Sequence, residues 1–192
     1  MRTFYFPMPL ARIVHWRPTE AGALIEACRS SGWKIDYPEG PTGATVTRGI
    51  RENMPDAVVI DLSRLPSHGR EIAVWMRTTK RSRHVPIVFA NGDAGKVEAI
   101  RQLLPDALYT TTAEVAGVLK SLAGGETRAA TLDPVVPAPM MERYELRSVA
   151  QKLGIGPEST VGVMDPPGTY AKAVGPLPEG VELIENPRAV QP

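Results

Sequence analysis

Short runs of apolar residues alternate with amphipathic stretches over the first two thirds of the chain. The runs Ala57–Asp61 and Pro86–Ala90 are apolar at nearly every position and rich in Val, Ile and Phe. Such runs are typical of strands that are buried on both faces of a parallel sheet. We therefore predict five strands in this region, at Ala11–Trp16, Trp33–Tyr37, Ala57–Asp61, Pro86–Ala90 and Ala107–Tyr109.

The stretches between these strands have the period of amphipathic helices. Thr19, Ser67 and Asp93 are placed to cap three of them, and Thr111–Glu114 has the spacing of a capping box before another. The alternation predicts an α/β fold with a five-stranded, parallel, doubly wound sheet of the flavodoxin-like type. The helical residues expected to face the core are Leu24, Ala27, Cys28, Val46, Ile50, Met54, Ile72, Trp75, Met76, Val97, Ile100, Leu103, Leu104, Val115, Val118 and Leu119.

Prolines mark a boundary after this region. The segment 124–142 has three prolines and no helical period, which predicts an extended linker between a domain at 1–123 and a small tail domain at 143–192. In the tail, a helix over Tyr144–Leu153 precedes a strand, a short helix and a second strand, which together make one βαβ unit. A unit of this size cannot bury both faces of its sheet, so we expect it to dock on another surface.

Composition narrows the class of protein. Hydrophobic residues make up 43% of the 192 residues, enough for a packed core, and the net charge of +1 gives no global attraction to nucleic acid. A single cysteine excludes an internal disulfide and a cysteine zinc cluster. No apolar run is long enough to span a membrane, and the opening segment is too short and too proline-rich for a signal peptide. We expect a soluble, cytoplasmic protein.

The sequence DAVVIDLSRLP is the most specific motif of the chain, because an apolar strand ends at Asp61 and Pro66 closes the loop that follows. With the order of strands and helices, it makes residues 10–122 resemble the receiver domains of bacterial response regulators. The resemblance implies that Asp61 stands where receivers accept phosphate from a histidine kinase. It also implies a Mg²⁺ held there by further carboxylates, with a hydroxyl and a lysine on the phosphate oxygens.

Four of the five receiver positions carry other residues here. The acidic pair expected after the first strand falls on His15 and Trp16, the hydroxyl position on Ala90 and the lysine position on Thr110. With Asp61 alone, Mg²⁺ would have one anionic ligand, too few for its octahedral shell. We therefore predict a degenerate pseudo-receiver that has no metal, no cofactor and no catalytic residue, with Asp61 as a residual phosphoacceptor position.

The tail has a resemblance of its own. KLGIGP, followed by a strand and then by GPLPEGVE, is similar to a small uncharacterised bacterial domain family over about Glu145–Glu185. The resemblance implies no activity.

Three further motifs have ordinary structural interpretations beside functional ones. The basic run Arg77–His84 could contact nucleic acid or form a solvated helix end, and the lack of interleaved aromatic residues favours the second. Asp165–Gly168 follows a strand, as phosphate loops do, but has no glycine fingerprint or phosphate-binding lysine. Ser67 and His68 are adjacent in sequence, which does not make a triad. Cys28 is expected in the core.

These observations favour a non-enzymatic, regulatory module of bacterial signalling that binds another protein. The face made by the last strand and helix, Ile100–Leu122, is the expected contact surface, for a second copy of the chain as well. One alternative is a receiver that is still phosphorylated on Asp61. The other is a ligand-binding or enzymatic module using a cleft around His15, Asp61, Asn91 and Asp165. Nucleic-acid and membrane partners are not expected.

Overall fold

Two compact units make up the chain in the computed structural model, Met1–Pro137 and Ala138–Pro192. The division between them lies inside the segment 124–142 that we predicted as a linker. The structure describes residues 8–38, 40–124, 133–138, 142 and 147–186. None of the helices in these described ranges is long and apolar enough to cross a membrane.

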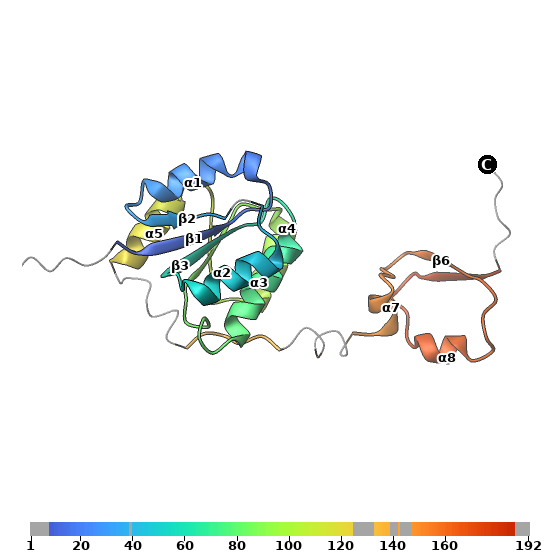
Figure 1. Ribbon diagram of the computed structural model, residues 1–192. Coiled ribbons are helices and arrows are strands. Elements are labelled where there is room, and N and C mark those ends of the chain that lie inside the picture. Colours follow the sequence, from blue (N-terminus) through green and yellow to red (C-terminus); the bar gives the residue numbers. More distant parts are fainter. Residues whose placement is uncertain (1–7, 39, 125–132, 139–141, 143–146, 187–192) are drawn as a thin grey trace, which may run out of the picture. The chain divides into compact units, whose positions relative to one another are not determined.

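A five-stranded parallel sheet forms the centre of unit 1 (Figure 1), in the order β2-β1-β3-β4-β5. All five predicted strands are present within two residues of the expected bounds, and the predicted α/β fold class is confirmed. The strands are β1 (Leu10–Val14), β2 (Lys34–Asp36), β3 (Ala57–Asp61), β4 (Ile87–Ala90) and β5 (Leu108–Thr110).

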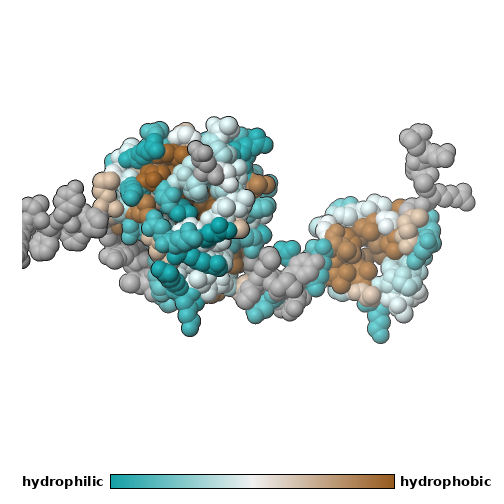
Figure 2. Space-filling view, viewed as in Figure 1, coloured by the Kyte–Doolittle hydropathy of each residue, from teal (hydrophilic) through white to brown (hydrophobic). Residues whose placement is uncertain are grey.

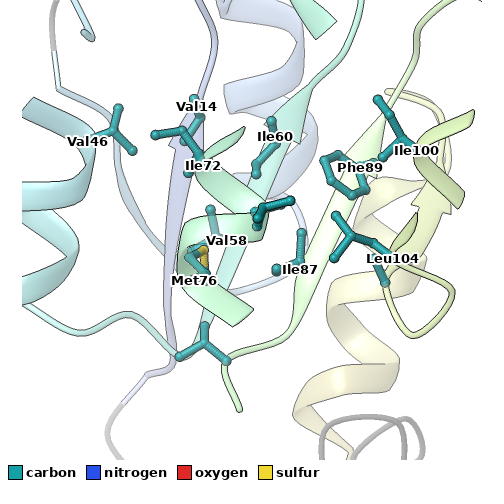
Figure 3. Close-up of a cluster of buried hydrophobic side chains, with 14 of the residues drawn as sticks. Val14, Val46, Val58, Ile60, Ile72, Met76, Ile87, Phe89, Ile100 and Leu104 are labelled. Atoms are coloured by element: carbon teal, nitrogen blue, oxygen red, sulfur yellow. The ribbon is translucent and has the colours of Figure 1, made fainter. Parts of the chain in front are cut away.

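Helices cover both faces of this sheet, so that its strands are buried from two sides. One buried cluster lies between the sheet and α2, α3 and α4, and Figure 3 shows Val14, Ile60 and Phe89 of the sheet pointing toward Ile72 and Ile100 in that cluster. The other lies between the sheet and α1 and α5. The helices are α1 (Gly22–Arg29), α2 (Gly43–Glu52), α3 (Pro66–Thr78), α4 (Ala94–Leu103) and α5 (Val115–Ala123).

The second cluster includes Cys28, which is fully buried as predicted. Trp33 anchors the start of β2 in the same cluster, because its indole N–H donates a hydrogen bond of 2.9 Å to the Leu119 carbonyl of α5. Burying a large apolar side chain contributes about 1.5–3 kcal/mol. Both faces of the sheet therefore have a full core, which fixes the position of every loop at its edges.

Two predicted helix caps are wrong. Thr19 lies inside a short 3-10 helix, Pro18–Glu20, and α1 begins after Ala21 without a side-chain cap. Ser67 lies inside the first turn of α3, because Pro66 already takes the first helical position and Leu65 precedes it with a left-handed backbone, φ 48°. In both places a neighbouring proline, rather than the hydroxyl, determines where the helix begins.

The other two predicted caps have different outcomes. Asp93 caps α4 as predicted, since its carboxylate accepts the backbone N–H of Lys96 at 3.1 Å. Thr111–Glu114 is not a capping box, because α5 begins only after Glu114, and the Thr111 hydroxyl instead donates to the Glu114 carboxylate at 3.1 Å.

Unit 2 has a two-stranded parallel sheet of β6 (Thr160–Val163) and β7 (Glu182–Glu185), with α8 (Tyr170–Val174) between them in sequence. The helix predicted over Tyr144–Leu153 is shorter where it is described: α7 (Val149–Lys152) begins after Ser148, which forms a capping box with Gln151. Residues 144–146 of that prediction lie outside the described residues. Gly154 ends the helix with φ +74°, as its position in KLGIGP predicts.

The described residues of unit 2 bury little. Among them only Ala150 is buried, while Leu153, Met164 and Ile184 are large apolar side chains with 65%, 68% and 38% of their surface exposed. Figure 2 shows apolar side chains on the visible surface of this unit. The expectation that one βαβ unit leaves apolar surface uncovered agrees with this burial.

Candidate functional site

The carboxyl ends of the central strands bring together the receiver-like positions predicted from the sequence. Asp61 is the last residue of β3, Ala90 the last of β4 and Thr110 the last of β5, and they are neighbours in register across the sheet. His15 follows β1 directly. Parallel strands end at the same edge of a sheet, so these four residues lie along one edge of the sheet of unit 1.

Asp61 is closed off from solvent by its own neighbours. Only 2% of its surface is exposed. One carboxylate oxygen, Oδ1, accepts the backbone N–H of Ser63 at 2.9 Å and also the Ser63 hydroxyl. The other, Oδ2, accepts the Asn91 side-chain amide at 2.7 Å. Both oxygens are therefore engaged by hydrogen bonds from within the domain.

His15 lies beside the same carboxylate. Its Nε2 is 3.6 Å from Asp61 Oδ1, and its side chain is 4% exposed. The other ring nitrogen, Nδ1, accepts the backbone N–H of Arg17 at 3.2 Å. Because Nδ1 accepts, the ring proton is on Nε2 and faces Asp61. After Ser63 and Asn91, His15 is thus the third residue with a donor beside Asp61, where a receiver would have a carboxylate.

Trp16 takes the second of the two acidic positions, and its indole ring is half-buried. It packs against the core cluster under α2 and α3, and its ring meets the ring of His68 edge-on at a centroid distance of 5.5 Å. Its indole nitrogen is buried and has no hydrogen-bond partner among the described residues. A large apolar ring thereby replaces a carboxylate.

Asn91 joins the loop after β4 to the loop after β5. Its Nδ2 group donates to Asp61 and also to the Thr112 hydroxyl at 2.9 Å, while its Oδ1 accepts the backbone N–H of Thr112 at 3.0 Å. The backbone of Asn91 is left-handed, φ 61°, a conformation that asparagine tolerates better than most residues. Neither Ala90 nor Thr110 donates a side-chain hydrogen bond to Asp61 within the described residues.

Sequence reasoning named Asn91 only as a cleft residue and missed Ser63 and Thr112. A serine two residues after a strand-end aspartate is a common turn pattern, so Ser63 could have been found. Thr112 could not, because its contact depends on the conformation of a loop that is 21 residues away in sequence.

The residues at this edge do not fit a Mg²⁺ ion. Mg²⁺ takes oxygen ligands in octahedral geometry and is held in proteins by carboxylates. Asp61 is the single carboxylate in the hydrogen-bonded cluster, and its oxygens already accept protein donors. In the described part of the chain, no three His, Cys, Asp or Glu side chains come together as a metal would need.

A groove of about 660 Å³ lies beside this cluster. It is lined by Trp16 and Arg17 after β1, by the loop from Ser63 to Ser67, and by Lys96 and Ile100 of α4, among others. We call it the Trp16 groove. Ser63 both lines it and binds Asp61, so the two sites share a wall.

The basic run Arg77–His84 is solvated in part, as expected for a helix end: Lys80, Arg81 and His84 are exposed, whereas two of its residues are buried. Arg77 is fully buried, and its guanidinium donates to Asp106 Oδ2 at 2.9 Å and to the carbonyls of Arg83 and Val85. Burial lowers the pKa of Arg77, and the neighbouring carboxylate of Asp106 opposes this. Ser82 is the other buried residue, and its hydroxyl donates to the Met76 carbonyl at the end of α3 at 3.1 Å.

Asp165, the fourth residue of the predicted cleft, belongs to unit 2. Its backbone N–H donates to the Asn186 side chain at 2.8 Å, which closes the ends of β6 and β7. The structure brings together His15, Asp61 and Asn91 in unit 1 and places Asp165 in the other unit.

Comparison with solved structures shows the fold of unit 1. A candidate response regulator of Chloroflexus aurantiacus J-10-fl is 20% identical and matches with a TM-score of 0.50, covering 64% of this chain and 99% of its own. The receiver domain of the sensor histidine kinase PA1611 of Pseudomonas aeruginosa PAO1 is 20% identical, with a TM-score of 0.50 over 62% of this chain and 99% of its own. That structure has a magnesium ion coordinated in its active site cleft.

A sensor protein from Polaromonas sp. JS666 matches in the same way, at 19% identity and a TM-score of 0.51, over 65% of this chain and 99% of its own. Neither a protein-family model nor a curated protein matches the sequence. The predicted receiver fold is confirmed: unit 1 has the architecture of the response-regulator receiver domains.

Proposed function

We propose that unit 1 is a receiver-type signalling module that is not switched by phosphorylation and that acts by binding another protein. The observation that carries the proposal is the state of Asp61, whose two oxygens are occupied by hydrogen bonds from Ser63 and Asn91 in a buried setting. A phosphoacceptor needs a free carboxylate oxygen that can reach its donor.

The charges around Asp61 support the same proposal. A phosphoryl group brings additional negative charge, which receivers neutralise with a metal and a lysine. Around Asp61 stand His15, Asn91 and Ser63. The nearby guanidinium of Arg64 is held by both oxygens of Glu20, at 2.8 and 3.1 Å. An acyl phosphate on Asp61 would therefore lack the lysine that receivers carry at the end of the fifth strand, where Thr110 stands here.

The test is phosphorylation of the full chain with acetyl phosphate and Mg²⁺, read by intact mass. We expect no mass increase, while a phosphorylatable receiver treated in parallel gains one phosphoryl group. The Asp61→Asn variant is the matched control. An adduct on the wild-type chain that is missing from this variant would show that Asp61 is a phosphoacceptor and would overturn the proposal in favour of a switched receiver.

For the partner surface we propose the face made by Ile100–Leu122 where the sheet ends, which includes the last residues of α4 together with β5 and α5. β5 is the last strand in the sheet order, so one of its edges has no neighbouring strand in this sheet. Beside it, the Arg101 guanidinium lies 4.0 Å from the centre of the Tyr109 ring, which leaves a mixed aromatic and cationic surface. Aromatic residues and arginine are the types enriched at protein interfaces.

Gly117 provides a clean test of this face. It is exposed on α5, and a Cβ placed there would meet no atom within 4 Å. Gly117→Arg should leave the fold intact while it blocks a partner. Gly43→Arg, at the start of α2 and equally uncrowded, is the matched control.

Sedimentation velocity of the full chain tests pairing between copies, and affinity capture followed by mass spectrometry tests other proteins. We expect association that Gly117→Arg abolishes and Gly43→Arg retains. Equal loss or equal retention by both variants would exclude this face as the partner surface.

A further inference from the structure

The Trp16 groove combines an apolar lining with a concentration of positive charge. Its volume of about 660 Å³ lies within the range of small-molecule sites, which is roughly 300–1,000 Å³. Apolar surface comes from Trp16, Leu65, Pro66 and Ile100. Leu65 is 52% exposed, which leaves its side chain available to a ligand.

Four cationic side chains line the same groove, from three different segments: Arg17, Arg64, Arg70 and Lys96. Two carboxylates pair with them. Glu20 binds Arg64 through two hydrogen bonds and lies 3.7 Å from Arg17, and Glu71 lies 2.8 Å from Arg70. With Asp61, whose charge also acts on Arg64, four cations face three anions, which leaves an excess of one positive charge.

Two features increase this excess. Lys96 has no ion pair within the described residues. The N-terminus of α3, a helix of 13 residues, contributes Pro66 and Ser67 to the groove and has neither a side-chain cap nor an acidic residue in its first turn. The partial positive charge of a helix N-terminus therefore adds to that of the side chains.

We infer that the Trp16 groove binds an organic anion, meaning a small molecule with an apolar, preferably aromatic, body and a phosphate or carboxylate group. The apolar lining accounts for the body, and the cationic side chains with the helix N-terminus account for the anionic group. This inference does not depend on whether Asp61 is phosphorylated or on the partner surface of α5.

The position of the groove gives such a ligand a route to the Asp61 cluster. Ser63 contributes to the lining of the groove and binds Asp61 through both its N–H and its hydroxyl. A ligand that contacts Ser63 or Arg64 would therefore touch the loop after β3 directly and could change its conformation. It acts on this loop from outside, without any covalent change at Asp61.

The test uses the full chain with two probes, adenosine monophosphate for a phosphate ligand and 2-naphthoate for a carboxylate ligand. Adenosine and inorganic phosphate serve as partial ligands. Binding is followed by two-dimensional NMR of the backbone amides and of the Trp16 indole N–H. We expect at least one probe to shift the signals of Trp16 and of Ser63–Ser67, with a Kd below about 1 mM, and to bind more tightly than either partial ligand.

Lys96→Glu should weaken that binding by about tenfold or more, since a charge-assisted contact becomes a repulsion. The variant should fold, because an acidic residue is favourable in the first turn of α4. Lys80→Glu, an exposed lysine outside the groove, is the matched control and should bind like the wild type. Ala99→Trp, which fills the groove from α4, should abolish binding.

Three results would overturn the inference. They are no shift with either probe at millimolar concentration, equal weakening by Lys96→Glu and Lys80→Glu, and binding of adenosine as tight as that of its monophosphate. If Lys96→Glu by itself shifted the amide signals of residues 147–186, the occupant would be unit 2 of the same chain, which would also contradict a small-molecule site.

Discussion

Replacing Asp61 by asparagine distinguishes a structural carboxylate from a reactive one by the sign of its effect on stability. In a site crowded by carboxylates, removal of one negative charge relieves repulsion and stabilises the fold. Here the carboxylate accepts hydrogen bonds from Ser63 and Asn91, and its neighbour is the N–H face of His15. Loss of the charge should therefore destabilise unit 1.

The magnitude follows from the donors around residue 61. In one orientation the new amide nitrogen faces Asn91 Nδ2, which lies 2.7 Å from the present oxygen, and in the other it faces the Ser63 N–H. Asn91 cannot turn its amide without losing the Thr112 N–H. Either orientation sets the new N–H group against at least one donor that it cannot bond, which costs about 2 kcal/mol. For a domain of this size, that lowers the melting temperature by roughly 6–12 °C.

Tryptophan fluorescence during thermal or urea unfolding of the full chain measures this effect. Trp16, Trp33 and Trp75 all belong to unit 1, so the signal reports that unit alone. Asp93→Asn makes the same chemical change at the exposed cap of α4, where asparagine caps as well as aspartate, and should change stability by less than about 0.5 kcal/mol. An Asp61→Asn variant as stable as the wild type, or more stable, would refute the structural role of this carboxylate.

Two other predictions concern buried polar groups. Arg77→Leu should reduce the free energy of unfolding, measured in urea, by about 3–5 kcal/mol, because Asp106 would keep a nearly buried charge without its partner. Arg81→Leu, at an exposed position, should change this free energy by less than about 0.5 kcal/mol. Equal effects of the two substitutions would contradict a stabilising role of the buried Arg77–Asp106 pair. Burial raises the pKa of the Cys28 thiol from 9.0 to about 12, so Ellman's reagent at pH 8 should label Cys28 only as fast as the protein unfolds. Since the unfolded thiol ionises first, this group should lower stability progressively as pH rises from 9 toward 12, and rapid labelling of the folded chain would contradict its burial.

The strands and the fold class were predictable because burial on both faces leaves a strong pattern. β3 lies at the predicted residues Ala57–Asp61, since every position in it is buried and none could be polar except the last. The helix starts near Pro18 and Pro66 were less predictable. There the local backbone, a 3-10 turn in one case and a left-handed Leu65 in the other, takes precedence over the hydroxyl side chains that suggested caps.

The candidate site was predictable in its positions and not in its contacts. That His15, Asp61, Ala90 and Thr110 share one edge follows from the strand order alone. The hydrogen bonds that occupy Asp61 depend on the left-handed conformation of Asn91, which no periodicity reports. The groove could not be predicted from the sequence either, because its cationic residues come from segments that only the folded chain brings together.

The link from Asp61 through Asn91 to Thr112 has a consequence for how information could pass through this domain. It ties the loops after β3, β4 and β5 to one another by hydrogen bonds that are all satisfied at once. Loops held in this way have one preferred arrangement, and a two-state device needs two of comparable free energy. Under the function proposed above, the output of unit 1 would depend on how much of the protein is present and on which partners or ligands occupy its surfaces, rather than on the activity of a kinase.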